Sequence, residues 1–368
     1  MKNSLMALFV LFFSVLSLLA QESLPIRGLY VGAPSPEDVT EFCSVIENEL
    51  APSGVNLIVL RVDFGYKYES HPELAEEKGL DKNDIALLVA ACKKNGIRLI
   101  PQVNLLGHQS WATKPGKLLM VYPEFDETPE IQFPAEYKWP NPDGLYCKSY
   151  CPLHPDVHKV VFDLVDEITD VFEADAFHAG MDEVFYIGHR QCKRCYGHDP
   201  AELFAGEVAK IENHLKGEGK ELWIWGDRLI DGKATGIGEW EASLNNTHRA
   251  IDLIPKSVVI CDWHYESAHP TPALFAAKGF RVLACPWRKG EVAVEQVAML
   301  KGFVKNASPQ MKSCYAGVMH TYWSSARQFM DGLAAKTENA KNDPSVNCFR
   351  ELAKVGYPKD WDFLKGKL

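Results

Sequence analysis

The sequence has no low-complexity tract, no internal repeat of solenoid period and no Gly/Ser-rich linker that would divide it into two domains. It also lacks an excess of positive charge. Its 49 acidic residues against 39 lysines and arginines give a net charge of −10, which argues against nucleic acid or an anionic membrane as a partner. The composition, 46% apolar and 24% charged, is that of an ordinary globular protein.

Long apolar runs are scarce, and the one at the N-terminus has a distinct pattern. Lys2 supplies an early positive charge, residues 5–19 are mainly apolar, and Ala20 is a small residue before polar Gln21. This pattern predicts a secretory signal peptide over 1–20, because the run is short and poorly flanked for the alternative, a retained membrane anchor. No cysteine follows the run to mark a lipidation site. We therefore expect an exported chain, periplasmic or secreted, without membrane association after cleavage.

Short apolar runs alternate with amphipathic helical segments along residues 21–368. The segment 106–155 interrupts this alternation and contains too many prolines for regular structure, so we expect it to form an extended loop. Eight strands with helical segments between most of them predict the α/β class and a single-domain (β/α)8 TIM barrel, with a long loop insertion after the third strand. The predicted strands are 26–33, 55–62, 97–103, 174–180, 222–225, 258–262, 282–285 and 317–321.

Polar and aromatic residues follow directly after most of these runs, and in this fold the chemistry gathers where the strands end. A core position explains any single tryptophan, but recurrence at the same relative position predicts a site. Aromatic rings at the rim of a cleft suit sugars, whose C–H faces lie on π surfaces. The residues are Asp63, Asn104, His108, Asp182, Glu183, Trp225, Asp227, Trp263, His264, Tyr265, Trp287, Tyr322 and Trp323.

The most informative of these positions is the adjacent pair Asp182 and Glu183, which follows the small residues Ala179 and Gly180. Neighbouring carboxylates repel when both are ionised, so we expect one of them to hold its proton near neutral pH. A protonated carboxyl can donate to a leaving oxygen. An acidic turn between a strand and a loop is the alternative for such a pair taken alone.

The segment HAGMDEVF resembles the His-x-Gly-Gly-Asp-Glu-Val motif of family 20 glycoside hydrolases, the β-N-acetylhexosaminidases, with Met181 in the second Gly position. The resemblance implies that Glu183 is the general acid and that Asp182 holds the acetamido group. It implies a retaining, substrate-assisted mechanism through an oxazolinium, with no cofactor for catalysis. The resemblance covers roughly residues 25–330 and is to the compact branch that consists of the catalytic domain alone.

A second segment, IPQVNLLGHQ, resembles the family's Ile-Pro-Glu-x-Asp-x-x-Gly-His element, with Gln102 and Asn104 at positions that are often acidic. The match implies that His108 contacts the general acid and that Asp63 lies behind this histidine. A relay through Asp63, His108 and Glu183 would fix the imidazole tautomer and tune the pKa of Glu183. A structural histidine is the alternative.

The resemblance also implies residues that bind the sugar. Arg27 resembles the family's arginine for the 3- and 4-hydroxyls, and a surface arginine at the lower rim of the barrel is the alternative. Larger members carry a tyrosine where this chain has Arg288. We therefore expect Tyr265 to bind the acetamido oxygen, with Tyr322 as second choice. The expected walls of the acetamido pocket are Trp225, Trp287 and Trp323.

The ten cysteines divide into two groups. Six lie in or beside predicted helices and strands and are expected to be small core residues. The other four, in loops, resemble a four-thiolate zinc site that joins two loops, whereas export favours disulfides. Both alternatives stay open, and either role would be structural. These four are Cys147, Cys151, Cys192 and Cys195.

Three functions are consistent with the sequence. The favoured one is an exo-acting β-N-acetylhexosaminidase that removes terminal β-linked GlcNAc or GalNAc from glycans. The second is a two-carboxylate retaining glycosidase on sugars without the acetamido group, with Glu183 as acid and Glu239, Glu241 or Asp227 as nucleophile. The third is a glycan-binding barrel that has lost catalysis.

Overall fold

The computed structural model describes residues 24–138 and 147–357, so the predicted signal peptide lies outside the described residues. Eight parallel strands close into a barrel in the order β1, β10, β9, β8, β7, β6, β3, β2. The predicted (β/α)8 barrel is confirmed, and each predicted strand is found. The strands are β1 Ile26–Gly32, β2 Leu57–Arg61, β3 Arg98–Leu105, β6 Ala176–Gly180, β7 Glu221–Trp225, β8 Val259–Trp263, β9 Arg281–Cys285 and β10 Tyr315–Tyr322.

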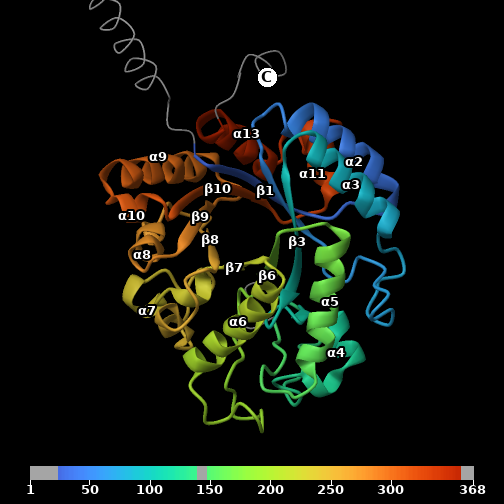
Figure 1. Cartoon of the computed structure of the whole chain (residues 1–368), viewed down its shortest axis with the longest axis vertical. Coiled ribbons are helices and arrows are strands. Elements are labelled where there is room, and N and C mark those ends of the chain that lie inside the picture. The colour runs from blue at the N-terminus through green and yellow to red at the C-terminus, as the bar shows by residue number, and fades with distance from the viewer. Residues whose placement is uncertain (1–23, 139–146, 358–368) are drawn as a thin grey trace, which may run out of the picture.

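Helices surround the strands, with α2, α3, α9 and α13 at one side of the barrel and α5 and α6 at the other (Figure 1). Among residues 24–138 and 147–357, no helix is both long enough and apolar enough to cross a bilayer. The helices are α2 Val39–Val45, α3 Lys82–Lys94, α4 Lys117–Val121, α5 Val157–Val171, α6 Pro200–Gly217, α7 Gly232–Thr235, α8 Thr271–Ala277, α9 Gly290–Asn306, α10 Pro309–Lys312, α11 Ala326–Leu333, α12 Glu338–Lys341 and α13 Pro344–Gly356.

The apolar side chains form two layers because residues alternate between the two faces of each strand. One layer lies between the strands and the helices, where α5 contributes Val161, Leu164 and Ile168 at helical spacing. The other fills the barrel interior with large side chains, among them Trp223 and Met319. The interior is therefore a packed core, and a substrate has access only at the ends of the strands.

The insertion after β3 is more ordered than its proline content predicts. Its described part contains a two-stranded hairpin, β4 Ser110–Trp111 and β5 Lys114–Pro115, followed by the short helix α4. The expectation of no regular structure over 106–155 was therefore wrong in this part. Each element is too short to produce a periodic pattern, and α4 is held by the buried side chains of Leu118 and Leu119.

Candidate active site

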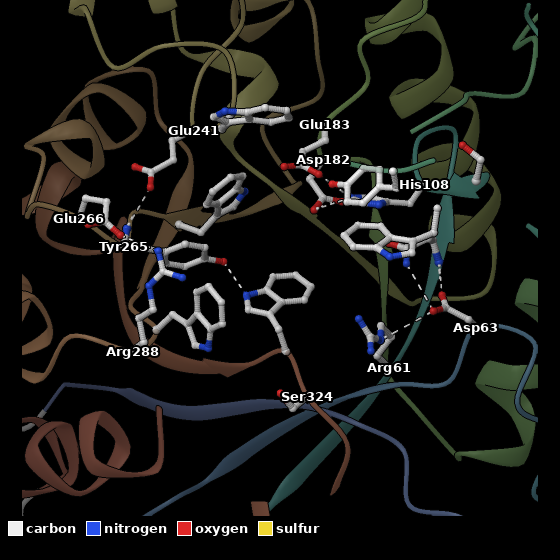
Figure 2. A pocket seen from close by; sticks show the side chains of 18 residues that line it. Arg61, Asp63, His108, Asp182, Glu183, Glu241, Tyr265, Glu266, Arg288 and Ser324 are labelled. Atoms are coloured by element: carbon white, nitrogen blue, oxygen red, sulfur yellow. Dashed lines mark hydrogen bonds and ion pairs between the residues drawn. The ribbon is translucent and has the colours of Figure 1, made fainter. Parts of the chain in front are cut away.

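A pocket of about 980 Å³ opens at the carboxyl ends of the barrel strands. Figure 2 shows Asp182, Glu183 and His108 on one side and Glu241 and Tyr265 on the other. Side chains that follow seven of the eight strands thus converge here, as expected for this fold. The lining residues are Arg61, Asp63, Asn104, His108, Ser110, Trp111, Tyr137, Asp182, Glu183, Trp240, Glu241, Trp263, Tyr265, Glu266, Trp287, Arg288, Trp323 and Ser324.

The turn after β6 has an unusual backbone. Met181 (φ 67°) and Glu183 (φ 50°) both adopt the left-handed region, which costs a residue with a Cβ about 1–3 kcal/mol. Gly180 (φ 66°) precedes them, and a Cβ there would lie 2.4 Å from Asn104 Oδ1. Asp227 holds the turn, because its Oδ2 accepts a 2.9 Å hydrogen bond from the Glu183 main-chain N–H. The strain therefore directs two carboxylates into one pocket.

His108 lies between these two carboxylates. Its Nε2 is 3.2 Å from both Asp182 Oδ2 and Glu183 Oε2. Burial opposes charge on both members of the His108–Asp182 pair, but their mutual attraction outweighs it. The pKa of Asp182 is therefore lowered and that of His108 is raised well above its usual value. Asp182 is thus ionised near neutral pH.

The second oxygen of Asp182 has no hydrogen-bond partner among the residues that the structure describes. Asp182 is 4% exposed, and its Oδ1 is buried without a hydrogen bond among the described residues. An unpaired buried carboxylate oxygen is costly, and such groups concentrate where a ligand completes the hydrogen bonding. Because Asp182 lines the pocket, a substrate N–H can reach this oxygen.

The predicted relay is found only in its His108–Glu183 part, because no hydrogen bond or ion pair joins Asp63 to His108 among the described residues. Asp63 Oδ1 accepts a 2.9 Å hydrogen bond from the Asn104 main-chain N–H, and Arg61 Nε lies 3.8 Å from Oδ2. The atom at His108 Nδ1 is instead Cys147 Sγ, at 3.2 Å, and this sulfur also lies 3.8 Å from Glu183 Oε2. Burial raises the pKa of Cys147 to about 12, so a neutral thiol takes the place predicted for a carboxylate.

Tyr265 and two of the three predicted tryptophans form the aromatic wall. The Tyr265 hydroxyl accepts a 2.7 Å hydrogen bond from Trp323 Nε1, and its ring contacts Trp263 and Trp287 at centroid distances of 4.9 and 5.2 Å. The hydroxyl is therefore fixed in position at the edge of the pocket (Figure 2).

Three other predicted sugar-binding residues lie elsewhere. Arg27 is at the opposite end of the barrel, where its guanidinium donates to the carbonyls of Gly54 and Leu24. Tyr322 points out of the barrel, and its hydroxyl donates to Asp343 Oδ2. Strand alternation places both side chains on the outer face.

Trp225 is the third of these residues. It is fully buried inside the barrel and does not line the pocket, because its ring lies beneath Trp323 at a centroid distance of 5.5 Å. It therefore supports the wall from behind.

Several pocket residues were not predicted as sugar ligands. Arg61, the last residue of β2, points into the pocket, as Figure 2 shows. Its position offered a signal, because a charged residue that ends an aliphatic strand lies at the catalytic end of a barrel. Trp240 and Tyr137 come from loops and Trp111 from the hairpin strand β4, and no local pattern indicated the path of these segments.

The three candidate nucleophiles of the two-carboxylate alternative have different environments. Asp227 is 1% exposed and accepts from Glu183 N–H, Arg228 Nε and Trp263 Nε1, so it holds the turn and does not line the pocket. Glu239 does not line the pocket either. Glu241 does, and its carboxylate is held by His264 Nδ1 at 2.8 Å and the main-chain N–H of Tyr265 at 3.2 Å.

The four loop cysteines do not form one group. All ten cysteines lie in the described part of the chain and are present as thiols. Cys151 Sγ lies 3.3 Å from Cys195 Sγ and 3.4 Å from Cys192 Sγ, whereas Cys147 faces His108 in the pocket. The predicted four-thiolate set was therefore wrong by one member. The Gln109 main-chain N–H donates to the Lys148 carbonyl, and this pairing holds the neighbouring Cys147 beside His108, away from the other three cysteines.

Comparisons with known proteins agree with this geometry. The family model described as "Glycosyl hydrolase family 20, catalytic domain" matches residues 63–328. A Beta-hexosaminidase of Porphyromonas gingivalis is 27% identical over 271 residues, covering 69% of this chain and 33% of the relative. A Lacto-N-biosidase of Bifidobacterium bifidum is 23% identical over 225 residues, covering 58% of this chain and 18% of the relative. The chain thus spans a third or less of the length of these two relatives.

Solved structures with the same fold are also similar. A beta-N-acetylhexosaminidase from Bacteroides fragilis aligns with a TM-score of 0.61 at 14% identity, over 94% of this chain and 69% of the other. A chitobiase from Flavobacterium johnsoniae aligns with a TM-score of 0.60 at 17% identity, over 93% and 52%. At these identities the likeness shows the barrel fold. Because the family model covers more than half of its residues, the chain belongs to glycosyl hydrolase family 20 through its catalytic domain.

Proposed function

We propose that this chain is an exo-acting β-N-acetylhexosaminidase that hydrolyses terminal β-linked GlcNAc or GalNAc from glycans with retention of configuration. The observation that carries the proposal is the unpartnered Oδ1 of ionised Asp182, buried beside Glu183 in an aromatic-lined pocket. An acetamido N–H is a hydrogen-bond donor of the right chemistry for this oxygen.

The mechanism follows from the two carboxylates. Glu183 gives its proton to the glycosidic oxygen as the bond to C1 breaks, while the carbonyl oxygen of the acetamido group attacks C1. Asp182 accepts the acetamido N–H and stabilises the positive charge of the resulting oxazolinium. Water then attacks C1, Glu183 takes its proton, and the sugar leaves with its original configuration. The reaction uses the substrate's own group as nucleophile and needs no cofactor.

Other pocket residues have chemistry that suits a sugar. The Tyr265 hydroxyl donates a hydrogen bond to the acetamido oxygen. Its O–H is free to do so because the hydroxyl oxygen already accepts from Trp323 Nε1. Arg61 and Glu241 offer a donor group and an acceptor group to ring hydroxyls. Trp263, Trp287 and Trp323 present apolar faces to the acetamido methyl group and the sugar ring.

Turnover of p-nitrophenyl glycosides tests this proposal. We expect hydrolysis of the β-GlcNAc or β-GalNAc substrate and none of the β-glucoside, because only the former carry the attacking group. NMR of the first product should show the β-anomer. Equal turnover of the glucoside would instead favour the two-carboxylate mechanism with Glu241, and turnover of neither would favour a glycan-binding barrel.

We also propose that the chain is exported, on the pattern of residues 1–20. Expression in a Gram-negative host followed by fractionation and N-terminal sequencing provides the test. The expected product lies outside the cytoplasm and begins at Gln21. A cytoplasmic product that retains Met1 would contradict the proposal.

A further inference from the structure

Three cysteines and one glutamate converge outside the catalytic pocket. The ligand atoms of Glu127, Cys151, Cys192 and Cys195 all lie within 4.8 Å of one another, and all four residues are buried. Glu127 is fully buried, and its Oε2 has no hydrogen-bond partner among the described residues. This carboxylate oxygen faces three thiols and no cationic side chain is in contact with it in the described structure, so its burial is costly.

The sequence spacing and the main-chain hydrogen bonds of this cluster suit a thiolate metal site. Cys192 and Cys195 are spaced as Cys-x-x-Cys, and the Cys195 main-chain N–H donates to Cys192 Sγ at 3.4 Å. The other Oε atom of Glu127 accepts a 3.0 Å hydrogen bond from the His189 main-chain N–H, which aims the carboxylate at the cysteines. Such a supporting hydrogen bond orients a ligand carboxylate for a metal.

The spacing of the sulfur atoms fits a metal better than a disulfide. Cys151 Sγ lies 3.3 and 3.4 Å from the other two sulfurs, whereas a disulfide bond is about 2.05 Å long. Tetrahedral zinc with bonds of about 2.3 Å separates its sulfur ligands by about 3.8 Å. A disulfide would also use only two of the three sulfurs and would leave the third thiol and Glu127 Oε2 without partners.

We infer that Glu127, Cys151, Cys192 and Cys195 form a structural zinc site of the Cys3Glu type. Four protein ligands close the coordination sphere, so the metal would have no open position for catalysis. The site joins the segment after β3 to the segment after β6. Cys147, which contacts His108, lies four residues before Cys151, so the metal would also restrain one side of the catalytic pocket.

Metal content of the full-length protein, purified without chelator or added metal, tests the inference. We expect about one zinc ion per chain by inductively coupled plasma mass spectrometry, and a Cys192→Ser/Cys195→Ser variant should lose it. Cys43→Ser is the matched control, because Cys43 lies in α2 and outside the cluster, and it should retain the metal. Glu127→Gln should release zinc faster to a chelator than the wild type, since the amide is a weaker ligand.

Wild-type measurements keep the test valid where a variant fails to fold. Native mass spectrometry should give the mass of the reduced chain plus one zinc ion, and the chelator should lower its melting temperature. A non-reducing peptide map that joins Cys151 to Cys192 or Cys195 would overturn the inference. So would a zinc-free native protein in which all three thiols are alkylated.

Discussion

The two ends of the barrel differ in how their charged groups are paired. At the amino ends of the strands, Arg98 and Arg281 both bind Glu221, and Arg98 also binds Asp175. At the carboxyl ends, Asp182 has an oxygen without a partner in the described part of the chain, and Glu183 has a strained backbone. The charged groups at the amino ends thus neutralise one another, whereas the carboxyl ends hold polar groups whose partner is the substrate.

Matched glutamate variants should give the largest contrast between the ends. Glu183→Gln cannot protonate the leaving oxygen, so kcat/KM should fall about 10²- to 10⁴-fold with little change in melting temperature. Glu221→Gln weakens ion pairs with two arginines and should lower the free energy of unfolding by about 1 kcal/mol, with kcat unchanged. Kinetics and thermal unfolding of both variants provide the measurement. Activity in Glu183→Gln close to that of the wild type would remove Glu183 from the proposed role.

Arg61 and Arg27 lie at opposite ends of the barrel, and their variants should have smaller effects. Arg61→Ala removes a charged donor from the pocket and should lower kcat/KM about 10- to 100-fold, equivalent to about 1.5–3 kcal/mol, without loss of stability. Arg27→Ala removes two hydrogen bonds to main-chain carbonyls and should cost about 1–3 kcal/mol of stability with normal kcat/KM. If Arg27→Ala instead lowered kcat/KM and Arg61→Ala lowered only the stability, Arg27 would be the sugar ligand.

The smallest expected effect is a pH dependence of stability at the catalytic end. The pKa of His108 is raised above 6.5, so its contribution is complete below 6.5 and is lost as pH rises through the higher folded value. The pKa of Asp182 is lowered below 3.8, so its contribution is complete above 3.8 and is lost as pH falls through the lower folded value. The His108–Asp182 pair therefore stabilises the folded state most between about pH 4 and 6.5.

Melting temperatures of the wild type and of His108→Gln, measured from pH 3 to 9, check this window. The difference between the two proteins should be greatest between about pH 4 and 6.5 and should shrink on both sides. A difference that does not vary with pH would mean that His108 and Asp182 are not a charged pair.

Much of the fold followed from the sequence, because barrel strands are buried on both faces and read as continuous aliphatic runs. The Asp182–Glu183 pair could also be predicted from the sequence, since two adjacent residues at the end of one strand must share a site. Arg27 was chosen by family resemblance, although its place at the start of a run pointed to the other end of the barrel. Arg61 ends the next apolar run, and this position correctly indicates the end of the barrel where the pocket lies.

Cys147 shows what the sequence could not provide. Its spacing to Cys151 suggested one metal site, yet it contacts His108, which lies 39 residues earlier in the chain. Glu127 had no local pattern at all and meets the cysteines because residues 125–127 pair with 149–151. Such contacts depend on the path of long loops, which tertiary packing sets and local periodicity does not encode.

In the proposed mechanism, Asp182 Oδ1 accepts a hydrogen bond from the acetamido N–H of the substrate. Isothermal titration calorimetry of a GlcNAc-derived thiazoline, a stable mimic of the oxazolinium, tests this contact directly in the wild type and in Asp182→Ala. We expect tight binding to the wild type and a loss of at least about 100-fold in the variant, the size expected for a charged hydrogen bond in a buried site. Equal affinity for the two proteins would contradict it.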